Sequence, residues 1–231
     1  LGEITASMAH EFNNPLGIVM GFAQDLLSET DPSSTHYRAL KIIDEETKRC
    51  QKIIQELLQF ARPSSAEFCL VDAKPIIEKT INLVANHLYK QKIEAATLID
   101  ENLPKLFADP QQIEQVLVNL YLNAIDAMPD GGKLMVAAKM EPLDGSASML
   151  VVTATDTGFG IEESDLAKIF QPFFSAKKGR GMGLGLSISE RIIKNHGGKI
   201  HVESEAGQGT TFRIYLPLDH QTQESNSVAE T

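Results

Sequence analysis

The first sixty residues carry apolar side chains at a spacing that restricts them to two amphipathic helices, expected at 2–28 and 35–61 with a breaker cluster between them. In the second helix these side chains recur every three or four positions, the pattern of a helical-bundle seam: Leu40, Ile43, Thr47, Cys50, Ile54, Leu57 and Ala61. Two antiparallel helices cannot bury such wide faces against each other alone. We therefore expect residues 2–61 to form a homodimer, as a dimeric four-helix bundle.

One histidine of the first helix lies away from its apolar face. At about 100° per residue, His10 falls opposite a row of apolar residues: Leu1, Ile4, Met8, Phe12, Pro15, Leu16, Val19, Ala23 and Leu26. Asn14, Gly17 and Gly21 lie near His10, so little side-chain bulk surrounds it. Position alone leaves an ordinary solvated surface histidine as the more frequent interpretation, with a reactive histidine as the alternative.

Composition excludes several classes of protein. The net charge of −10 argues against nucleic-acid binding, because an acidic surface repels phosphate backbones. The two cysteines form no metal-binding pattern and suggest a reducing compartment. No apolar run reaches the ~18 residues of a membrane span, and no signal peptide is visible. The chain opens at Leu1, so we expect a cytoplasmic fragment whose missing N-terminal part could hold a sensor or an anchor in the inner membrane.

A change of pattern at residues 62–66 marks the best domain boundary. We expect a helical hairpin at 1–62, a linker at 63–68, an α/β domain at 69–218 and a disordered tail at 219–231. Within the α/β domain, Asp109 and Pro110 give a clear helix start. The other signals favour helices at 72–89, 111–128 and 184–196, and strands at 68–71, 93–99, 133–139, 149–156, 199–204 and 210–216.

The helix at 111–128 combines a polar stripe with an otherwise apolar surface. Its amides and one carboxylate fall within about 60° of each other: Gln112, Gln115, Asn119, Asn123 and Asp126. A helix that is apolar nearly all round is buried, so this stripe needs partners. An internal polar network or ordered water could supply them, and so could a ligand with phosphates or a metal. Asn123 could give one oxygen to Mg²⁺.

Two glycine-rich segments follow. The first, Asp156-Thr-Gly-Phe-Gly, ends a strand with a carboxylate that could accept a hydrogen bond from an exocyclic amine such as that of adenine, although such turns are common. The second, at 179–185, has glycine at every second position, with Lys177, Lys178 and Arg180 beside it and a helix directly after it. Backbone N–H groups of such a loop can bind anionic oxygens; a mobile surface loop is the alternative. The segment at 179–185 matches neither the Walker A loop nor the dinucleotide-binding fingerprint.

Together these segments, spread over residues 3–217, resemble the sensor histidine kinases of two-component signalling. Residues 7–16, Ser-Met-Ala-His-Glu-Phe-Asn-Asn-Pro-Leu, resemble the phosphoacceptor motif. Asn119-Leu-Tyr-Leu-Asn123 is similar to the Mg²⁺-binding asparagine motif, and Asp156-Thr-Gly-Phe-Gly to the adenine-binding motif. Residues 170–174 and 181–186 resemble the two ends of the ATP lid, and residues 196–200 and 207–212 the closing strands. The resemblance implies the ATP-binding fold shared with type II topoisomerases, Hsp90 chaperones and MutL proteins.

The resemblance also implies roles for individual residues. His10 would be the phosphoacceptor, Glu11 the general base and Asn14 the residue that orients water for a phosphatase reaction. Asn123 would hold Mg²⁺. ATP would contact a larger set of residues from the asparagine motif, the glycine turn, the lid and the last strand: Asn119, Asn123, Asp156, Gly158, Gly160, Phe173, Lys177, Gly181, Gly183, Leu184, Gly185 and Thr210.

The implied reaction moves the γ-phosphoryl group of ATP to His10 and then to an aspartate on a response regulator receiver domain. Met182 departs from the family, which often has Thr or Ser there, so one hydroxyl contact to phosphate is missing. The lid is short, as in nitrogen-regulation kinases. The role of Asp126 stays open, as does the choice between transfer within one chain and transfer across the dimer.

Two other functions compete with this interpretation. An ATP-driven clamp of the chaperone or mismatch-repair type carries a glutamate one turn before the Mg²⁺-binding asparagine, where this chain has Asn119. Without a base at that position, hydrolysis should be slow. The other alternative is a non-catalytic scaffold dimer that binds nucleotide, against which the intact motifs argue.

Overall fold

The computed structural model describes residues 2–61, 66–142, 148–175 and 182–218, with the side chains of residues 2–11, 52 and 55–61 outside the description. The expected tail at 219–231 and residues 63–65 of the expected linker therefore lie outside it. The chain divides into two compact units: the first contains the helical hairpin and, of the described residues, also 182–184, and the second is an α/β unit. No described helix combines the length and the apolar character needed to cross a membrane.

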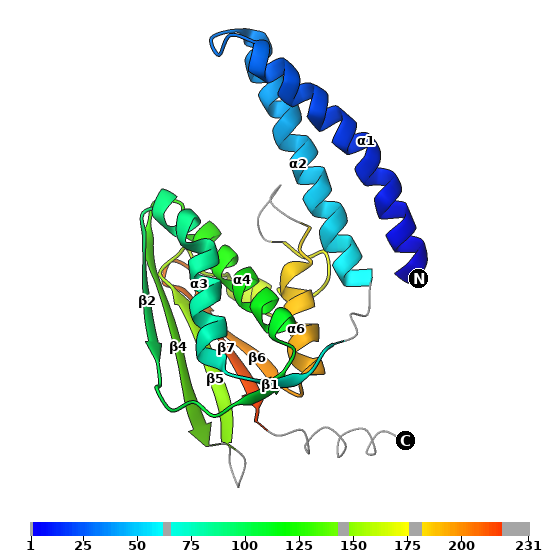
Figure 1. Ribbon diagram of the computed structural model, residues 1–231. Coiled ribbons are helices and arrows are strands. Elements are labelled where there is room, and N and C mark those ends of the chain that lie inside the picture. The colour runs from blue at the N-terminus through cyan, green and yellow to red at the C-terminus, as the bar shows by residue number, and fades with distance from the viewer. Residues whose placement is uncertain (1, 62–65, 143–147, 176–181, 219–231) are drawn as a thin grey trace. The chain divides into compact units, whose positions relative to one another are not determined.

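The hairpin consists of α1 (Gly2–Glu29) and α2 (Thr35–Ala61), as the periodicity predicts (Figure 1). α1 continues through Pro15. The turn between the helices is held by Asp31, whose carboxylate accepts hydrogen bonds from the backbone N–H of Ser33 at 2.8 Å and from its hydroxyl at 2.7 Å. These bonds hold the pKa of Asp31 below its ordinary value.

Two polar residues are buried between the helices of the hairpin. Asp44 and Thr47 are buried there beside Ala23, and the Asp44 carboxylate accepts from Gln24 Nε2 at 2.9 Å and from Lys48 Nζ at 2.6 Å. Several large apolar side chains remain exposed: Phe12, Ile18, Val19, Phe22, Leu26, Ile42 and Ile43. Cys50, expected on the seam, is also exposed in the single hairpin. One copy of the hairpin thus leaves these large apolar side chains of its described part uncovered.

The α/β unit contains two sheets and one helical layer (Figure 1). The larger sheet has the strand order β2-β4-β5-β7-β6, with β2 parallel to β4 and the other pairs antiparallel. Its strands are β2 (Ile93–Ile99), β4 (Gly132–Pro142), β5 (Ser148–Asp156), β6 (Lys199–Glu205) and β7 (Gly209–Pro217). A small antiparallel sheet pairs β1 (Cys69–Val71) with β3 (Leu106–Ala108). The mixed α/β architecture expected from the sequence is confirmed.

The helices are α3 (Ala73–Lys90), α4 (Pro110–Ala127), the short α5 (Glu163–Leu166) and α6 (Gly185–Asn195). α3, α4 and α6 cover one face of the larger sheet (Figure 1). Neither β3 nor α5 was expected from the sequence. Each is only three or four residues long, which is too short for a hydrophobic period to register.

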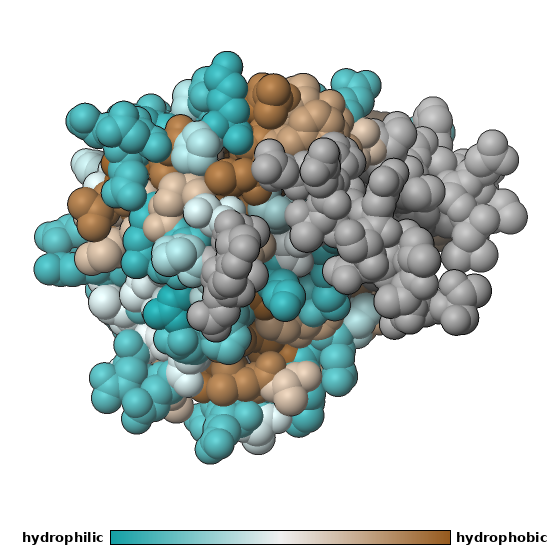
Figure 2. All heavy atoms as spheres, turned by 90° about the horizontal axis from the view of Figure 1, so that it is seen from below, coloured by the Kyte–Doolittle hydropathy of each residue, from teal (hydrophilic) through white to brown (hydrophobic). Residues whose placement is uncertain are grey.

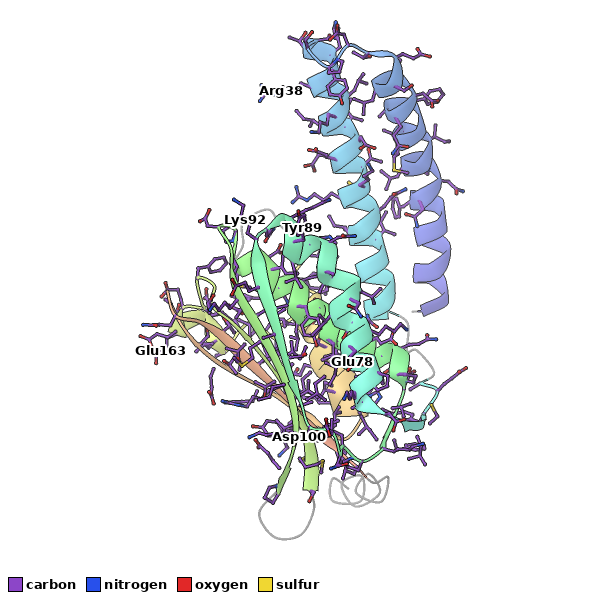
Figure 3. The ribbon with its side chains drawn as sticks, turned by 60° about the vertical axis from the view of Figure 1, so that its left-hand side comes forward. Arg38, Glu78, Tyr89, Lys92, Asp100 and Glu163 are labelled. Carbon is purple, nitrogen blue, oxygen red and sulfur yellow. The ribbon has the colours of Figure 1, made fainter. Side chains whose placement is uncertain are left out.

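The core lies between the helical layer and the larger sheet. β4 alternates in the manner of a strand with one covered face: Leu134, Val136 and Ala138 are buried, while Met135 is half exposed. α4 supplies the centre of the core, with Val116 and Leu120 almost wholly buried. Charged side chains such as Glu78, Lys92, Asp100 and Glu163 extend outward (Figure 3). From below, hydrophilic residues cover most of the surface around smaller apolar groups (Figure 2).

Candidate nucleotide site and phosphoacceptor helix

The N-terminus of α4 is fixed by Asp109, as the sequence predicts. Asp109 Oδ1 accepts from the backbone N–H groups of Gln111 at 2.9 Å and Gln112 at 3.2 Å, the geometry of an N-cap. Asp109 Oδ2 accepts from the backbone N–H of Glu67 at 3.1 Å. One carboxylate therefore caps α4 and also ties the segment before β1 to it.

His196, at the end of α6, is the second part of this anchor. It is buried, and its Nε2 accepts from the backbone N–H of Asp109 at 3.0 Å. The proton therefore sits on Nδ1, which donates to the Ile192 carbonyl at 2.8 Å. Phe68 packs against the ring, with centroids 4.7 Å apart. Burial lowers the pKa of His196, while the Ile192 carbonyl and Asp109 act in the opposite direction.

This anchor should make stability depend on pH. The folded chain holds His196 neutral. The stabilisation of the fold by this side chain is therefore fully present above the ordinary histidine pKa of about 6.5. It is lost as the pH falls through that value toward the lower pKa of the folded state, since the unfolded chain then binds a proton that the folded chain excludes. We expect the free energy of unfolding in urea to fall between pH 7 and pH 5.5 by up to about 1.4 kcal/mol per pH unit from this group.

His196→Gln is the matched variant, because it keeps a polar side chain and removes the titration. Its free energy of unfolding should be lower at pH 7 and should vary less between pH 7 and pH 5.5. An equal pH slope in the two proteins would show that His196 does not control this dependence.

The polar stripe of α4 is only partly covered. Gln112 is buried, but Gln115, Asn119, Asn123 and Asp126 are half-buried, which corrects the expectation of a wholly buried stripe. Asn119, in the middle of this row, faces Gly185 and Ser189 of α6. A half-buried row of amides offers donors and acceptors both to the protein and to a ligand.

Asn119 joins α4 to α6. Its Nδ2 donates to Ser189 Oγ at 2.9 Å. A Cβ atom at Gly185, the first residue of α6, would overlap the Asn119 side chain, so this approach requires glycine. A contact within the protein thus supplies the hydrogen-bond partner of one member of the polar stripe. Asn123 lies one turn further along α4, toward the end of the helix.

The turn after β5 packs against both α4 and the β6–β7 turn. Asp156 is buried, and its Oδ1 accepts from the backbone N–H groups of Gly158 at 2.8 Å and Thr210 at 3.3 Å. A Cβ atom at Gly158 would overlap Ala127 at the end of α4. Gly160 has φ +71° and lies against the Glu205 carbonyl, so a side chain there would be strained and would clash.

These contacts bring most of the expected nucleotide-binding residues together around the C-terminal half of α4. Asn119 and Asn123 lie on the helix, Gly185 lies against Asn119, and the turn from Asp156 packs on Ala127. Thr210 pairs directly with Asp156 across β5 and β7. The backbone N–H of Phe159 also donates to the Ala127 carbonyl at 3.1 Å.

The expected lid residues are described in part. Phe173 is exposed and has a φ of +66°, which is unusual for a bulky side chain. Gly183 has φ +70° and Leu184 is buried. Lys177 and Gly181 lie outside the described residues.

The expected phosphoacceptor residues lie on α1, in the hairpin. His10 and Glu11 are within the helix, but their side chains are outside the described set. Asn14, one turn after His10, is exposed to solvent.

Three polar residues that hold α4 or the Asp156 turn in place were not assigned a role from the sequence: Ser189, His196 and Ser204. His196 belongs to the closing motif that resembles the family. Its hydrogen bond with Asp109 could not be inferred from the sequence, because 87 residues separate the two. The two serines carry no signal in a single sequence, because a serine on a helix or strand is ordinary. Only their hydrogen-bond partners distinguish them.

Comparisons with known proteins agree with this arrangement. Residues 1–66 match the His Kinase A (phospho-acceptor) domain, and residues 108–220 match the Histidine kinase-, DNA gyrase B-, and HSP90-like ATPase. The second match implies that the α/β unit binds ATP. The sensor histidine kinase ZraS of Salmonella typhimurium is 34% identical over 218 residues, which cover 94% of this chain and 46% of ZraS. The chain therefore spans about half the length of this curated relative.

Two solved structures resemble the chain over most of its length. Full-length ShkA in complex with AMPPNP has a TM-score of 0.77 and 27% identity, over 94% of this chain and 46% of ShkA. Histidine kinase ThkA in complex with the response regulator TrrA has a TM-score of 0.69 and 31% identity, over 96% of this chain and 63% of ThkA. With both family matches in the order expected from the motifs, the chain belongs to the sensor histidine kinases of two-component systems.

Proposed function

We propose that this chain is an ATP-dependent protein-histidine kinase that phosphorylates its own His10. The observation that carries the proposal is the joining of a phosphoacceptor-type hairpin to an α/β unit in which Asn119, Asp156, Gly158 and Gly185 gather around α4. The clamp-type ATPase and the scaffold are not favoured, because neither needs a His Kinase A domain.

In this proposal each segment binds one part of the nucleotide. Asp156 and Thr210 recognise the adenine, and the close packing of Gly158 and Gly160 keeps side chains out of the turn beside it. Asn119 and Asn123 lie beside the phosphates. The lid supplies further contacts through Phe173, Lys177, Gly181, Gly183, Leu184 and Gly185.

We propose that Mg²⁺ accompanies the nucleotide. The described residues contain no group of three histidine, cysteine or acidic side chains that could hold a metal by themselves. This fits Mg²⁺, which is usually held by one or two protein oxygens together with phosphate oxygens and water. The half-buried Asn123 would provide the amide oxygen, and the ion would neutralise phosphate charge during transfer.

The transfer itself is a nucleophilic substitution at the γ-phosphorus. A ring nitrogen of neutral His10 forms the new N–P bond, the bond from phosphorus to the β,γ-bridging oxygen breaks, and ADP leaves. Glu11, the next residue, accepts the proton from the other ring nitrogen as general base. Because ATP is the donor, we place this reaction in the cytoplasm and any anchor in the inner membrane outside this part of the chain.

We propose that the hairpin works as a homodimer. The row of exposed apolar side chains from Phe12 to Leu26 and at Ile42 and Ile43 is too large for a stable isolated hairpin. A second copy would bury it as a four-helix bundle.

The phosphoryl group would then pass to an aspartate of a response regulator receiver domain. ThkA, similar to this chain over most of its length, was solved with such a regulator. We propose that the opposing activity, hydrolysis of the regulator's aspartyl phosphate to aspartate and inorganic phosphate, uses Asn14, whose exposed amide could orient the attacking water.

Asn14→Ala tests this division of roles. We expect phosphorylation of His10 to stay within about twofold of wild type, and dephosphorylation of the phosphorylated regulator to slow roughly 10- to 100-fold, since only the latter needs a positioned water. Single-turnover assays of both reactions give the two rates. Asn13→Ala is the neighbouring control and should leave both rates unchanged. Equal loss of both reactions in Asn14→Ala would reject the assignment.

The kinase itself is tested by incubating the chain with γ-labelled ATP. Label that is stable in alkali and released by acid identifies phosphohistidine. Lack of such label in a folded protein that binds ATP would refute the proposed function.

A further inference from the structure

The hydroxyl of Ser204, near the end of β6, joins three segments of the α/β unit. It donates to the Gly209 carbonyl at 2.8 Å and accepts from the backbone N–H of Ile161 at 2.9 Å. It also lies 2.9 Å from the hydroxyl oxygen of Thr210. Ser204 therefore connects the turn that follows Asp156 with the start of β7. Glu163, labelled in Figure 3, marks α5, which begins two residues after Ile161.

Each hydroxyl carries one proton, and this decides whether Ser204 or Thr210 donates in the contact between them. Ser204 has a single hydroxyl proton, and the Gly209 carbonyl, which can only accept, takes it. Ser204 Oγ can then only accept from its other partners. The Thr210 hydroxyl must therefore donate to Ser204, and its oxygen is left with acceptor capacity alone.

Sheet register places this oriented hydroxyl beside Asp156. Thr210 pairs with Asp156 on β5 and with Ser204 on β6, so the three side chains form one row on a single face of the sheet. Asp156 and Thr210 are both 5% exposed. The Asp156 carboxylate is held by the backbone N–H groups of Gly158 and Thr210.

We propose that Ser204 is a positioning residue for base specificity, an inference that rests on the proposed nucleotide site at Asp156 and Thr210. By holding the Thr210 proton, Ser204 leaves the Thr210 hydroxyl oxygen as an acceptor beside the Asp156 carboxylate, which also accepts. Two acceptors suit the amino group at C6 of adenine, which donates. They repel the keto oxygen at C6 of hypoxanthine or guanine, which also accepts, and a buried polar pair left without a partner is costly.

The test compares the binding of ADP and inosine diphosphate, which differ at C6 and in the protonation of N1. Isothermal calorimetry with the whole chain gives both dissociation constants and their ratio. Ser204→Ala frees the Thr210 hydroxyl to donate toward the base, so we expect the preference for ADP to fall roughly five- to tenfold. Ser204→Thr retains a hydroxyl and should restore most of the preference.

A double-mutant cycle separates this role from a structural one. On a Thr210→Val background there is no hydroxyl to orient, so adding Ser204→Ala should leave the ratio unchanged. Thr211→Val is the matched control. It removes a hydroxyl from the next residue of β7, which lies on the opposite face and pairs with Thr155 at 3.1 Å, and the ratio should stay at the wild-type value.

The outcomes distinguish the two proposals. If wild type does not bind ADP, the nucleotide site itself is refuted. If ADP binds and Ser204→Ala leaves the preference ratio unchanged, only the role of Ser204 is overturned. The same holds if Ser204→Ala lowers the ratio as much on the Thr210→Val background as it does in wild type. Should Ser204→Ala unfold, Thr210→Val alone carries the test, because it removes the oriented hydroxyl and keeps the bonds of Ser204 to Ile161 and Gly209. An unchanged ratio in that variant overturns the proposal.

Discussion

His10→Gln is expected to abolish incorporation of acid-labile label from γ-labelled ATP, a loss of at least about 1000-fold. Glutamine is polar and favourable in a helix, so α1 should persist. Its amide nitrogen has no lone pair available for attack on phosphorus, because that pair is delocalised into the carbonyl, whereas neutral imidazole is a competent nucleophile near pH 7. The rate of label incorporation, followed under alkaline conditions that preserve phosphohistidine, measures the effect.

Two controls make this result specific. The dissociation constant for ADP should not change in His10→Gln, because the site around α4 belongs to the α/β unit. His36→Gln, an exposed histidine at the start of α2, should be labelled like wild type. Label that persists in His10→Gln would place the phosphoacceptor at another residue.

Asn123→Ala is expected to remove the Mg²⁺-dependent part of ATP affinity. Loss of a metal ligand weakens binding more than loss of a residue that only orients one, which costs 10- to 100-fold, so we expect a loss of about 100-fold or more. The alanine should fit, because Asn123 is half-buried and alanine is the best helix former. Calorimetry with ATP in Mg²⁺ and in EDTA gives the two affinities.

The difference between those two conditions is the decisive quantity. In wild type Mg²⁺ should strengthen ATP binding, and in Asn123→Ala the two affinities should converge. Gln111→Ala, in the exposed first turn of α4, should behave as wild type. An unchanged response to Mg²⁺ in Asn123→Ala would remove this residue from the metal site while leaving the nucleotide site in place.

The sequence by itself determined the elements whose signals are local. Helical spacing predicted α1, α2 and α4 within two residues of their ends, and Asp109 with Pro110 predicted the start of α4. Such signals are visible because one face of a helix repeats every three or four residues and capping acts within one turn. The motifs that identify the family are likewise short, contiguous stretches around His10, Asn123, Asp156 and Gly183.

Only the tertiary structure decided which of these stretches meet and how their polar atoms are shared. The pairing of Asp156 with Thr210 depends on the register between β5 and β7, over 54 residues of chain. The contact of His196 with Asp109 and that of Asn119 with Ser189 join helices that are adjacent only after packing. A hydrogen bond needs its two partners within about 3 Å in a fixed orientation. Local sequence does not encode that condition for distant residues, whereas packing against the common core imposes it.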